Sequence, residues 1–432
     1  MLKQLLKSMR SGLSGLPDSR KGGNNQQYTM LDAVLSAFSV FFMQSPSFLA
    51  HQRDLRRQKG RDNAQSLFGV HEIPSDNQIR NLLDPLNPNQ VGGVYWSVYE
   101  ELSQSGVLKE HCGIDQTLLC AMDGTQYFSS TKIHCPNCNE KQHGEQTTYS
   151  HSAIAPVLVS PNDSYVINLE PEFITPQDGS EKQDCEQNAI KRWIERNASH
   201  FVPYSTTILT DDLHCHQPVV ALCLHHKLNF IMVCLPDSHP TLYQEIALLD
   251  KINALQRVVH TSWNGRFHEV WTYRYVNSVP IRSGEDALKV NWCELTIVNQ
   301  QTGELLYHNA FATNFHLSDV RVAAVVRSGR ARWKTENENH NTLKNQGYHL
   351  EHNFGHGHQF LAAFLLSLNL LAFLLHTVLQ LTDTLYQKIR TELGPRTTFF
   401  DDIRTLTRYL LFDSWDHLLT FMATQLELTA SP

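Results

Sequence analysis

The feature that most restricts the fold of this chain is a series of short apolar runs between residues 113 and 236, separated by polar turns. Three candidate strands come first, within "TLLCAMDGTQYF", "SAIAPVLVS" and "SYVINLEPEFI", and the amphipathic helix "DCEQNAIKRWIERNA" follows them. The strand "STTILTDDLH", the helix "QPVVALCLHHKL" and the buried strand "FIMVCLP" complete the series. This order predicts an α/β fold with a mixed sheet flanked by helices.

Aspartates end the first and the fourth of these strands. Asp123 follows the first strand, and Asp211 and Asp212 follow the fourth. The strand order is that of an RNase H-like sheet, in which carboxylates sit at these two strands. An aspartate at a strand end is most often a turn residue, so only the joint position of the two indicates a site. Because adjacent residues of a strand point to opposite faces, only one of Asp211 and Asp212 can face that site.

A third acid is expected from a helix within "RARWKTENENHNTLKN". Residues four apart lie on one helix face, which aligns Arg332, Glu336 and His340, with Lys344 one turn further. Glu338 lies about 200° round the helix from Glu336 and faces elsewhere. The same pattern also fits a solvated helix with an Arg-Glu pair. Three carboxylates from distant segments are enough to hold two Mg²⁺ ions about 4 Å apart, so the sequence indicates a two-metal phosphodiester site.

The N-terminal region, residues 1–110, is expected to form a helical and basic domain. Residues 1–70 carry a formal charge of +6, whereas the rest of the chain carries −13, so the basic end is the candidate phosphate-binding surface. A helix capped by Ser75 or Asp76 with Arg80 exposed can enter a DNA groove, although two helices of a bundle give the same pattern. The expected DNA-binding residues are Arg53, Arg56, Arg57, Lys59, Arg61 and Arg80.

The remaining boundaries follow from changes in pattern. Residues 111–236 form the first part of the α/β core, 237–320 a mostly β insertion, 321–380 the second part of the core, and 381–432 a helical tail. The apolar segment Phe360–Leu375 contains Ser367 and Asn369 and meets His376 after about 16 residues, short of the ~20 that span a bilayer. We therefore expect a buried helix and no membrane contact.

A cluster of cysteines and histidines in "HCPNCNEKQHGEQTTYSH" indicates a candidate zinc site. Cys135 and Cys138 form a Cys-x-x-Cys pair, His143 adds a third ligand, and Cys215 or His134 can supply the fourth. Reduced thiols without metal and a redox pair are the alternatives. Nine cysteines without a signal-peptide pattern favour reduced thiols and a cytoplasmic protein. The stretch "HNFGHGHQF", with His352, His356 and His358, can also bind metal, but packing at the start of a helix or contact with DNA phosphate is the favoured interpretation.

Three motifs resemble one family. "MDGTQYFSS" at Asp123, "LTDDLHCHQPV" at Asp211 and "RWKTENENHNTLKNQGYHLEH" at Glu336 are similar to bacterial insertion-sequence transposases of the DDE type, over roughly residues 70 to 380. The family's second motif, Asp-x-x-aromatic, sets Asp211 rather than Asp212 at the catalytic position. In the third motif Gly329 stands where the family usually has Tyr, and Lys344 lies eight residues after Glu336 instead of seven.

The resemblance implies an RNase H-like catalytic core and a cut-and-paste DNA transposase. It implies that Asp123, Asp211 and Glu336 hold two Mg²⁺ or Mn²⁺ ions, and that Arg332, Lys344 and His340 position phosphate. The implied partners are double-stranded DNA, as inverted-repeat ends and target, and a second copy in a homodimer, in the nucleoid of the bacterial cytoplasm. The alternatives are a decayed transposase that binds DNA without cutting it and a zinc-dependent phosphoesterase in which the cysteine-histidine cluster is catalytic.

Overall fold

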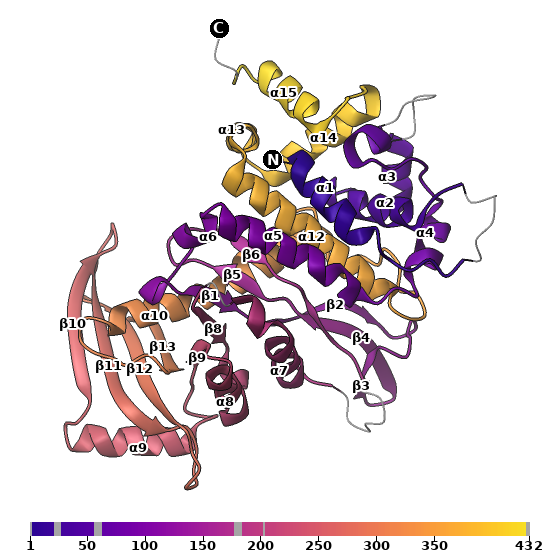
Figure 1. Cartoon of the computed structure of the whole chain (residues 1–432). Helices are drawn as coiled ribbons and strands as arrows, with labels where there is room; N and C mark the ends of the chain where they lie inside the picture. Colours follow the sequence, from indigo (N-terminus) through magenta and orange to yellow (C-terminus); the bar gives the residue numbers. More distant parts are fainter. Residues whose placement is uncertain (1, 21–26, 56–62, 177–183, 202–203, 429–432) are drawn as a thin grey trace.

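The structure is a computed structural model that describes residues 2–20, 27–55, 63–176, 184–201 and 204–428. Over these residues the chain is a mixed α/β protein with a nine-stranded sheet, a separate four-stranded sheet and helices packed against both (Figure 1). The strand order of the large sheet is β10-β11-β12-β13-β9-β8-β1-β5-β6.

The middle of the large sheet is its most buried part. β1 (Leu118–Ala121), β8 (Thr206–Thr210) and β9 (Asn229–Val233) are parallel, and β5 (Val157–Val159) and β6 (Val166–Asn168) are antiparallel to their neighbours. Every residue of β1, β5, β6 and β8 is buried, because helices or chain cover both faces. The helices α7 (Glu186–Asn197) and α8 (Gln217–His225) connect these strands.

The prediction of single second and third strands was wrong, because a proline divides each of these segments into two strands. Pro156 separates β4 (Gln146–Ile154) from β5, and Pro171 separates β6 from β7 (Glu172–Ile174). Proline has no N–H to donate to a ladder, so the chain leaves one sheet and enters the other at each proline. β2 (Gly124–Ser130), β3 (Asn139–His143), β4 and β7 form the four-stranded sheet.

Residues 240–313 lengthen the large sheet at one edge. The helix α9 (Pro240–Lys251) precedes four strands, and the last of them, β13, pairs antiparallel with β9 (Figure 1). Gly303, with φ of 71°, makes the turn between the last two strands. These strands are β10 (Gln256–Trp263), β11 (His268–Pro280), β12 (Lys289–Asn299) and β13 (Leu305–Thr313).

The two ends of the chain pack together on one side of the sheets (Figure 1). Arg408 pairs with Asp54 at 2.9 Å, and Asn63 donates from Nδ2 to the carbonyl oxygen of Thr407 at 2.7 Å.

The helices of these two parts of the chain are α1 (Leu2–Leu13), α2 (Met30–Phe42), α3 (Phe48–Leu55), α4 (Asp76–Leu83), α5 (Gly92–Gln104) and α6 (Val107–Glu110), then α12 (Leu361–Thr382), α13 (Thr384–Leu393), α14 (Arg396–Tyr409) and α15 (Trp415–Gln425).

Helix α12 is the longest apolar element, and its composition follows from burial. Its 22 residues are long and apolar enough to cross a membrane, yet 89% of the most apolar window is buried against the rest of the chain. It packs on α2 and on β6. Its polar groups are satisfied inside the core: Asn369 donates to the Tyr348 carbonyl, and Tyr95 donates to the Ser367 carbonyl. These contacts are those of a core helix.

Shorter helical segments complete the described chain. They are the π-helical turns Ala64–Phe68 and Thr335–His340, the 3₁₀ turns Pro88–Val91, Ile114–Gln116, Ala198–Phe201, Asp212–His214 and Ala331–Trp333, and the α-helices α10 (Val322–Arg330) and α11 (Asn341–Asn345).

Candidate active site

Asp123 and Asp211 lie side by side at the carboxyl ends of two parallel strands. β1 and β8 are neighbours, and Ala121 pairs with Leu209 in their register. Asp123 and Asp211 each come two residues further along, so both strands deliver an aspartate to the same level of the sheet edge. The strand ends that the sequence singled out are therefore brought together in space.

The electrostatics of Asp123 show that further acids surround it. Its side chain is 19% exposed. Burial and the negative charges of Asp211, Glu336 and Glu186 raise its pKa to about 6, although the nearby Arg332 opposes the shift. The negative charges of three further carboxylates therefore act on Asp123.

Glu336 reaches this cluster from a different part of the chain, together with two of the residues predicted on its face. Arg332 donates from Nη2 to Oε1 of Glu336 at 2.9 Å, and its Nη1 lies 4.0 Å from Oδ2 of Asp123. Nδ1 of His340 also lies 4.0 Å from Oδ2 of Asp123. Burial, with the charges of Lys344 and Arg332, lowers the pKa of His340 to about 4, so the ring is neutral at physiological pH.

The segment that carries Glu336 is not the regular helix that the sequence predicts. α10 ends at Arg330, a 3₁₀ turn follows, and Thr335–His340 is a π-helical turn before α11. A π turn accommodates one residue more than an α turn and is common at functional sites. Lys344, beyond this turn, pairs with Glu351 at 2.9 Å. Asn339 anchors the segment to β6 by accepting a bond from Asn168 at 2.9 Å.

Asp211 and Asp212 have different surroundings. Asp212 accepts from the backbone N–H of Leu235 at 2.6 Å and from the hydroxyl of Ser238, and it lies 3.3 Å from Nδ1 of His239. Asp211 faces the acidic cluster instead, and its buried Oδ1 accepts no hydrogen bond from the residues that the structure describes. The geometry thus places Asp211 with Asp123 and gives Asp212 a role in holding the loop after β9.

Glu186 is a fourth acid of the cluster that the sequence analysis missed. It occupies the first turn of α7, where acidic residues are common because of the helix dipole. Its carboxylate lies so close to Gly124 that a Cβ on that glycine would meet Oε1 at 2.3 Å. The buried His214 lies between Glu186 and Asp211, with Nε2 at 3.8 and 3.5 Å from their oxygens. In the sequence, only Gly124, which leaves room for the Glu186 carboxylate, could have indicated that Glu186 lies beside Asp123.

This donor set fits a hard divalent cation. Carboxylate oxygens from several strands and helices are the ligands that Mg²⁺ takes in proteins. The Oδ1 of Asp211, buried and without a described donor, is an oxygen that a cation would satisfy. Bound cations would also offset the burial and the repulsion that raise the pKa of Asp123.

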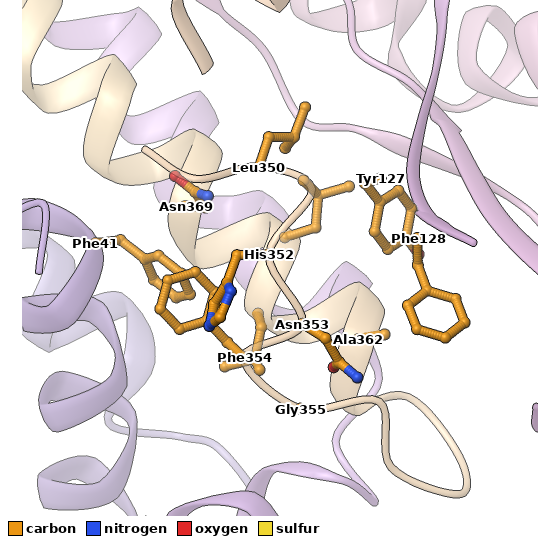
Figure 2. A pocket seen from close by; sticks show the side chains of 12 residues that line it. Phe41, Tyr127, Phe128, Leu350, His352, Asn353, Phe354, Gly355, Ala362 and Asn369 are labelled. Atoms are coloured by element: carbon orange, nitrogen blue, oxygen red, sulfur yellow. The ribbon is translucent and has the colours of Figure 1, made fainter. Parts of the chain in front are cut away.

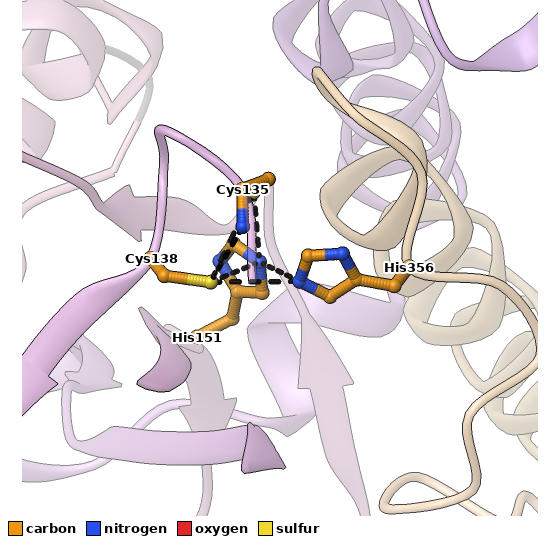
Figure 3. Close-up of side chains that lie close together, drawn as sticks. All are labelled: Cys135, Cys138, His151 and His356. Carbon is orange, nitrogen blue, oxygen red and sulfur yellow. Dashed lines mark hydrogen bonds between the residues drawn. The ribbon is translucent and has the colours of Figure 1, made fainter. Parts of the chain in front are cut away.

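Of the four expected zinc ligands, Cys135 and Cys138 lie together, but their partners are not the predicted His143 and Cys215. Cys135 and Cys138 converge with His151 and His356 (Figure 3). His143, one of the predicted ligands, is exposed at the end of β3. The exposed His134, the alternative fourth ligand, stacks on Tyr149. His143 was expected as the third ligand, but the β3–β4 hairpin places it away from the thiols.

Cys215, the other predicted ligand, belongs to a separate buried group with Cys234 and His239. Nε2 of His239 lies 2.5 Å from the Cys215 carbonyl oxygen, and Nδ1 faces the Leu235 carbonyl and Asp212, both at 3.3 Å. Burial lowers the pKa of His239, but Cys234, the Cys215 carbonyl and Asp212 together raise it to about 9. A ring with acceptors at both nitrogens offers no lone pair to a metal, so this group is a hydrogen-bond network.

The expected DNA-binding residues are only partly within the described chain. Arg53 is exposed in the last turn of α3, whereas Arg56, Arg57, Lys59 and Arg61 lie outside the described residues. Arg80 differs from the expectation of a free, exposed side chain. Its Nε donates to the Phe354 carbonyl at 2.9 Å and its guanidinium lies over the Phe48 ring, because α4 packs against the segment before α12.

The fold and the site define an α/β protein with a half-buried group of carboxylates near the ends of parallel strands, of the residue types that bind divalent metal ions. No family model matches the chain, and no curated protein matches it. Among solved structures, the cryo-EM structure of a piggyBac transposase synaptic complex with hairpin DNA has a TM-score of 0.38 to this chain. The two share 9% sequence identity over 100% of this chain and 80% of that one. A likeness of this size does not assign a family.

Proposed function

We propose that this chain is a DNA transposase of the DDE type, encoded by a bacterial insertion sequence, whose acids Asp123, Asp211 and Glu336 hold two Mg²⁺ or Mn²⁺ ions. One observation carries the proposal: β1 and β8 deliver Asp123 and Asp211 to the same level of one sheet edge, and Arg332 lies beside both Asp123 and Glu336 from the segment after α10. Acids that come from separate segments and outnumber the cations beside them are typical of metal-dependent sites.

The sheet topology supports the same proposal. The order β6-β5-β1-β8-β9, with β5 antiparallel to β1 and with β1, β8 and β9 parallel, supports the proposal of an RNase H-like core. In that arrangement the acids at the first and fourth strands come together, as Asp123 and Asp211 do. Residues 240–313 then form the β insertion between the second and third acids.

Each residue of the site has a separate task in this proposal. Bound metal ions would activate a water or a 3′-hydroxyl and stabilise the charge that develops on the phosphate. Asp123, Asp211 and Glu336 would hold them, with Glu186 beside Gly124 as a further carboxylate. Arg332, fixed by Glu336, presents a planar guanidinium to a phosphate. The neutral His340 beside Asp123 can donate or accept one hydrogen bond.

The two departures from the family's third motif have local physical causes. A Cβ at Gly329 would meet Ile231 and Phe311 at 2.9 Å, because α10 lies close on β9 and β13, so a tyrosine does not fit there. The π turn at Thr335–His340 adds one residue, which compensates for the displacement of Lys344 by one position. Lys344 then stays on the side of His340, whose pKa its charge lowers.

The proposed partners are the two inverted-repeat ends of the element and a target duplex, bound by a homodimer in the nucleoid. The exposed Arg53 and the basic residues that follow it are the proposed contact to end DNA.

Strand cleavage tests this function. The full chain is incubated with duplex DNA taken from the flanks of its own gene, in Mg²⁺ or Mn²⁺, and nicks and strand-transfer products are resolved on denaturing gels. We expect products from the wild type and from Asp212→Asn, and a loss of at least about 100-fold in Asp211→Asn, since one metal ligand of a two-metal site is removed. Equal cleavage by Asp211→Asn and wild type would contradict the proposal. Salt-sensitive binding without any scission would identify a DNA-binding protein that has lost catalysis.

A further inference from the structure

Four buried side chains from three distant segments point at one another beside β2 (Figure 3). Cys135 and Cys138 lie in the turn between β2 and β3, His151 lies on β4, and His356 lies in the segment that leads to α12. The structure assigns to these four residues a zinc site, which crosslinks the four-stranded sheet to the segment between Glu336 and α12. This inference stands independently of the proposed transposase function.

The spacing of the ligand atoms matches a tetrahedral zinc shell. The two Sγ atoms are 3.9 Å apart, three sulfur-to-nitrogen distances are 3.5 Å, and the two Nε2 atoms are 3.1 Å apart. Zinc bonds of about 2.3 Å to sulfur and about 2.05 Å to nitrogen give tetrahedral edges of about 3.8 Å between the sulfurs, 3.6 Å between sulfur and nitrogen and 3.3 Å between the nitrogens. Each of these distances is therefore within about 0.3 Å of the edge expected for Cys₂His₂ zinc.

The local structure prepares the ligands for a metal. In the Cys-x-x-Cys turn the N–H of Cys138 donates to the Cys135 carbonyl at 3.1 Å, and the N–H of Cys135 points to Sγ of Cys138 at 3.4 Å. Nδ1 of His356 lies 2.9 Å from the Gly357 carbonyl oxygen. That bond fixes the tautomer in which Nε2 has its lone pair directed at the centre, as is usual for zinc-bound histidine.

Neither a disulfide nor a set of neutral hydrogen bonds fits the cluster as well as a metal does. A disulfide has sulfur atoms about 2.05 Å apart, and the two thiols here are free. Two thiols and two imidazoles around one centre can form only some of their hydrogen bonds at once, whereas a metal uses all four donor atoms. Thiolate ligands favour zinc over Mg²⁺, and four protein ligands leave no open position, so the site is structural rather than catalytic.

The proposed zinc crosslink joins β2 to the segment before α12 beside a small cavity, where side chains fill the space incompletely. Tyr127 and Phe128 of β2 face Leu350, Phe354 and Gly355 across a cavity of about 30 Å³, which Figure 2 shows together with Ala362 of α12. Near the metal site, Asn137 donates to the Gln359 carbonyl at 2.7 Å. Cys138 and His356 are 218 residues apart, so a bond between them removes much of the freedom of the unfolded chain.

The test is the metal content of the full chain, expressed with zinc in the medium and measured after gel filtration by plasma mass spectrometry. It is done in an Asp123→Asn background, so that the carboxylate cluster contributes little. We expect one zinc per chain, and one also in the matched control His143→Ala, which changes the exposed histidine of the same hairpin. His356→Ala and Cys138→Ser are expected to lose at least about nine-tenths of the zinc. Zinc retained by both variants would overturn the assignment.

A second measurement applies if these variants do not fold. Titration of the folded Asp123→Asn chain with a mercurial reagent should release one zinc as the thiols react. The same protein loaded with Co²⁺ should show the visible bands of tetrahedral cobalt and a thiolate-to-cobalt charge-transfer band. Folded protein that carries no zinc and shows no thiolate band would overturn the assignment. Because this test uses neither DNA nor the three acids, its outcome is separate from that of the cleavage assay.

Discussion

At the scale of single residues, Asp123 lies where its charged form destabilises the metal-free fold. Its carboxyl is buried among Asp211, Glu336 and Glu186, which favours the protonated form and raises its pKa from 3.8 to about 6. A carboxyl whose pKa is higher in the folded state stabilises the fold below pH 4, and this contribution is lost as the pH rises through 6. The metal-free protein is therefore less stable at neutral pH, and a bound cation would remove this destabilisation.

Replacing the Asp123 carboxyl with an amide should remove the same destabilisation, because the amide carries no charge at any pH. In EDTA we expect Asp123→Asn to be more stable than the wild type at pH 7.5, by up to about 3 kcal/mol for a shift of roughly two pKa units. The difference should shrink towards zero as the pH falls from 7 to 4. Urea denaturation of both proteins across this range measures it. Equal stability of the two proteins at pH 7.5 would mean that neither burial nor the neighbouring acids disfavour the charged form of Asp123 in the folded chain.

The residues that sequence could predict are those defined by local pattern. Asp123 and Asp211 end apolar strands, and Cys135 and Cys138 share one turn, so neighbouring residues suffice to indicate them. The histidine-rich stretch around His356 indicated a possible metal ligand, but no local pattern joined it to Cys135 and Cys138. Glu186 carries no such signal, because it acquires its role by packing against Gly124 from another part of the chain. His143 shows the opposite error, since its convenient spacing is cancelled by the β3–β4 hairpin.

At the scale of elements, periodicity predicted the segments and missed their interruptions. The buried strands of the large sheet follow from their apolar runs, whereas Pro156 and Pro171 divide two of the runs between two sheets. Around Glu336 the i, i+4 contact with Arg332 survives, although the helix changes to a π turn. Two side chains four residues apart can still contact each other within one turn. A π turn, however, changes which residues lie on the same face further along the helix.

The close approach of α10 to the sheet can be tested at Gly329. A Cβ there would lie 2.9 Å from atoms of Ile231 and Phe311, both buried, so Gly329→Ala should destabilise the protein by about 1–3 kcal/mol through overpacking. Gly93→Ala is the matched control, because this helical glycine of α5 has no atom within 4 Å of its Cβ position. It should be neutral or stabilising, by up to about 1 kcal/mol. Urea midpoints compare the two, and a Gly329→Ala protein as stable as the wild type would show that α10 packs less closely.

At the scale of the whole molecule, the charge is divided between a basic beginning and an acidic remainder. Residues 1–70 carry +6 against −13 for the rest. The helices of this basic part pack with those of the C-terminal end, for instance through Arg408 and Asp54, so the expected N-terminal domain and C-terminal tail share one core. Sequence composition located the basic segment, but it could not show which distant helices support it.

DNA affinity should depend on salt through this basic part. Each neutralised phosphate contributes about −0.9 to the slope of log K against log salt, so replacing five basic residues should make the slope shallower by up to about 4.5. Fluorescence anisotropy at several NaCl concentrations measures it. The replaced cluster is Arg53, Arg56, Arg57, Lys59 and Arg61; the control replaces exposed residues on the other side of the chain, Lys251, Arg257, Arg266 and Arg282. An unchanged slope for the first set, with a changed slope for the second, would place the DNA surface elsewhere.

The carboxylate cluster is tested most sharply by locating the metal ions themselves. Crystals of the full chain are soaked in Mn²⁺, and anomalous diffraction is recorded at the manganese edge. We predict two peaks about 4 Å apart within coordination distance of Asp123, Asp211 and Glu336, and their loss in Asp123→Asn. Peaks held elsewhere, or carboxylates of these three residues that bind no manganese, would contradict the two-metal site.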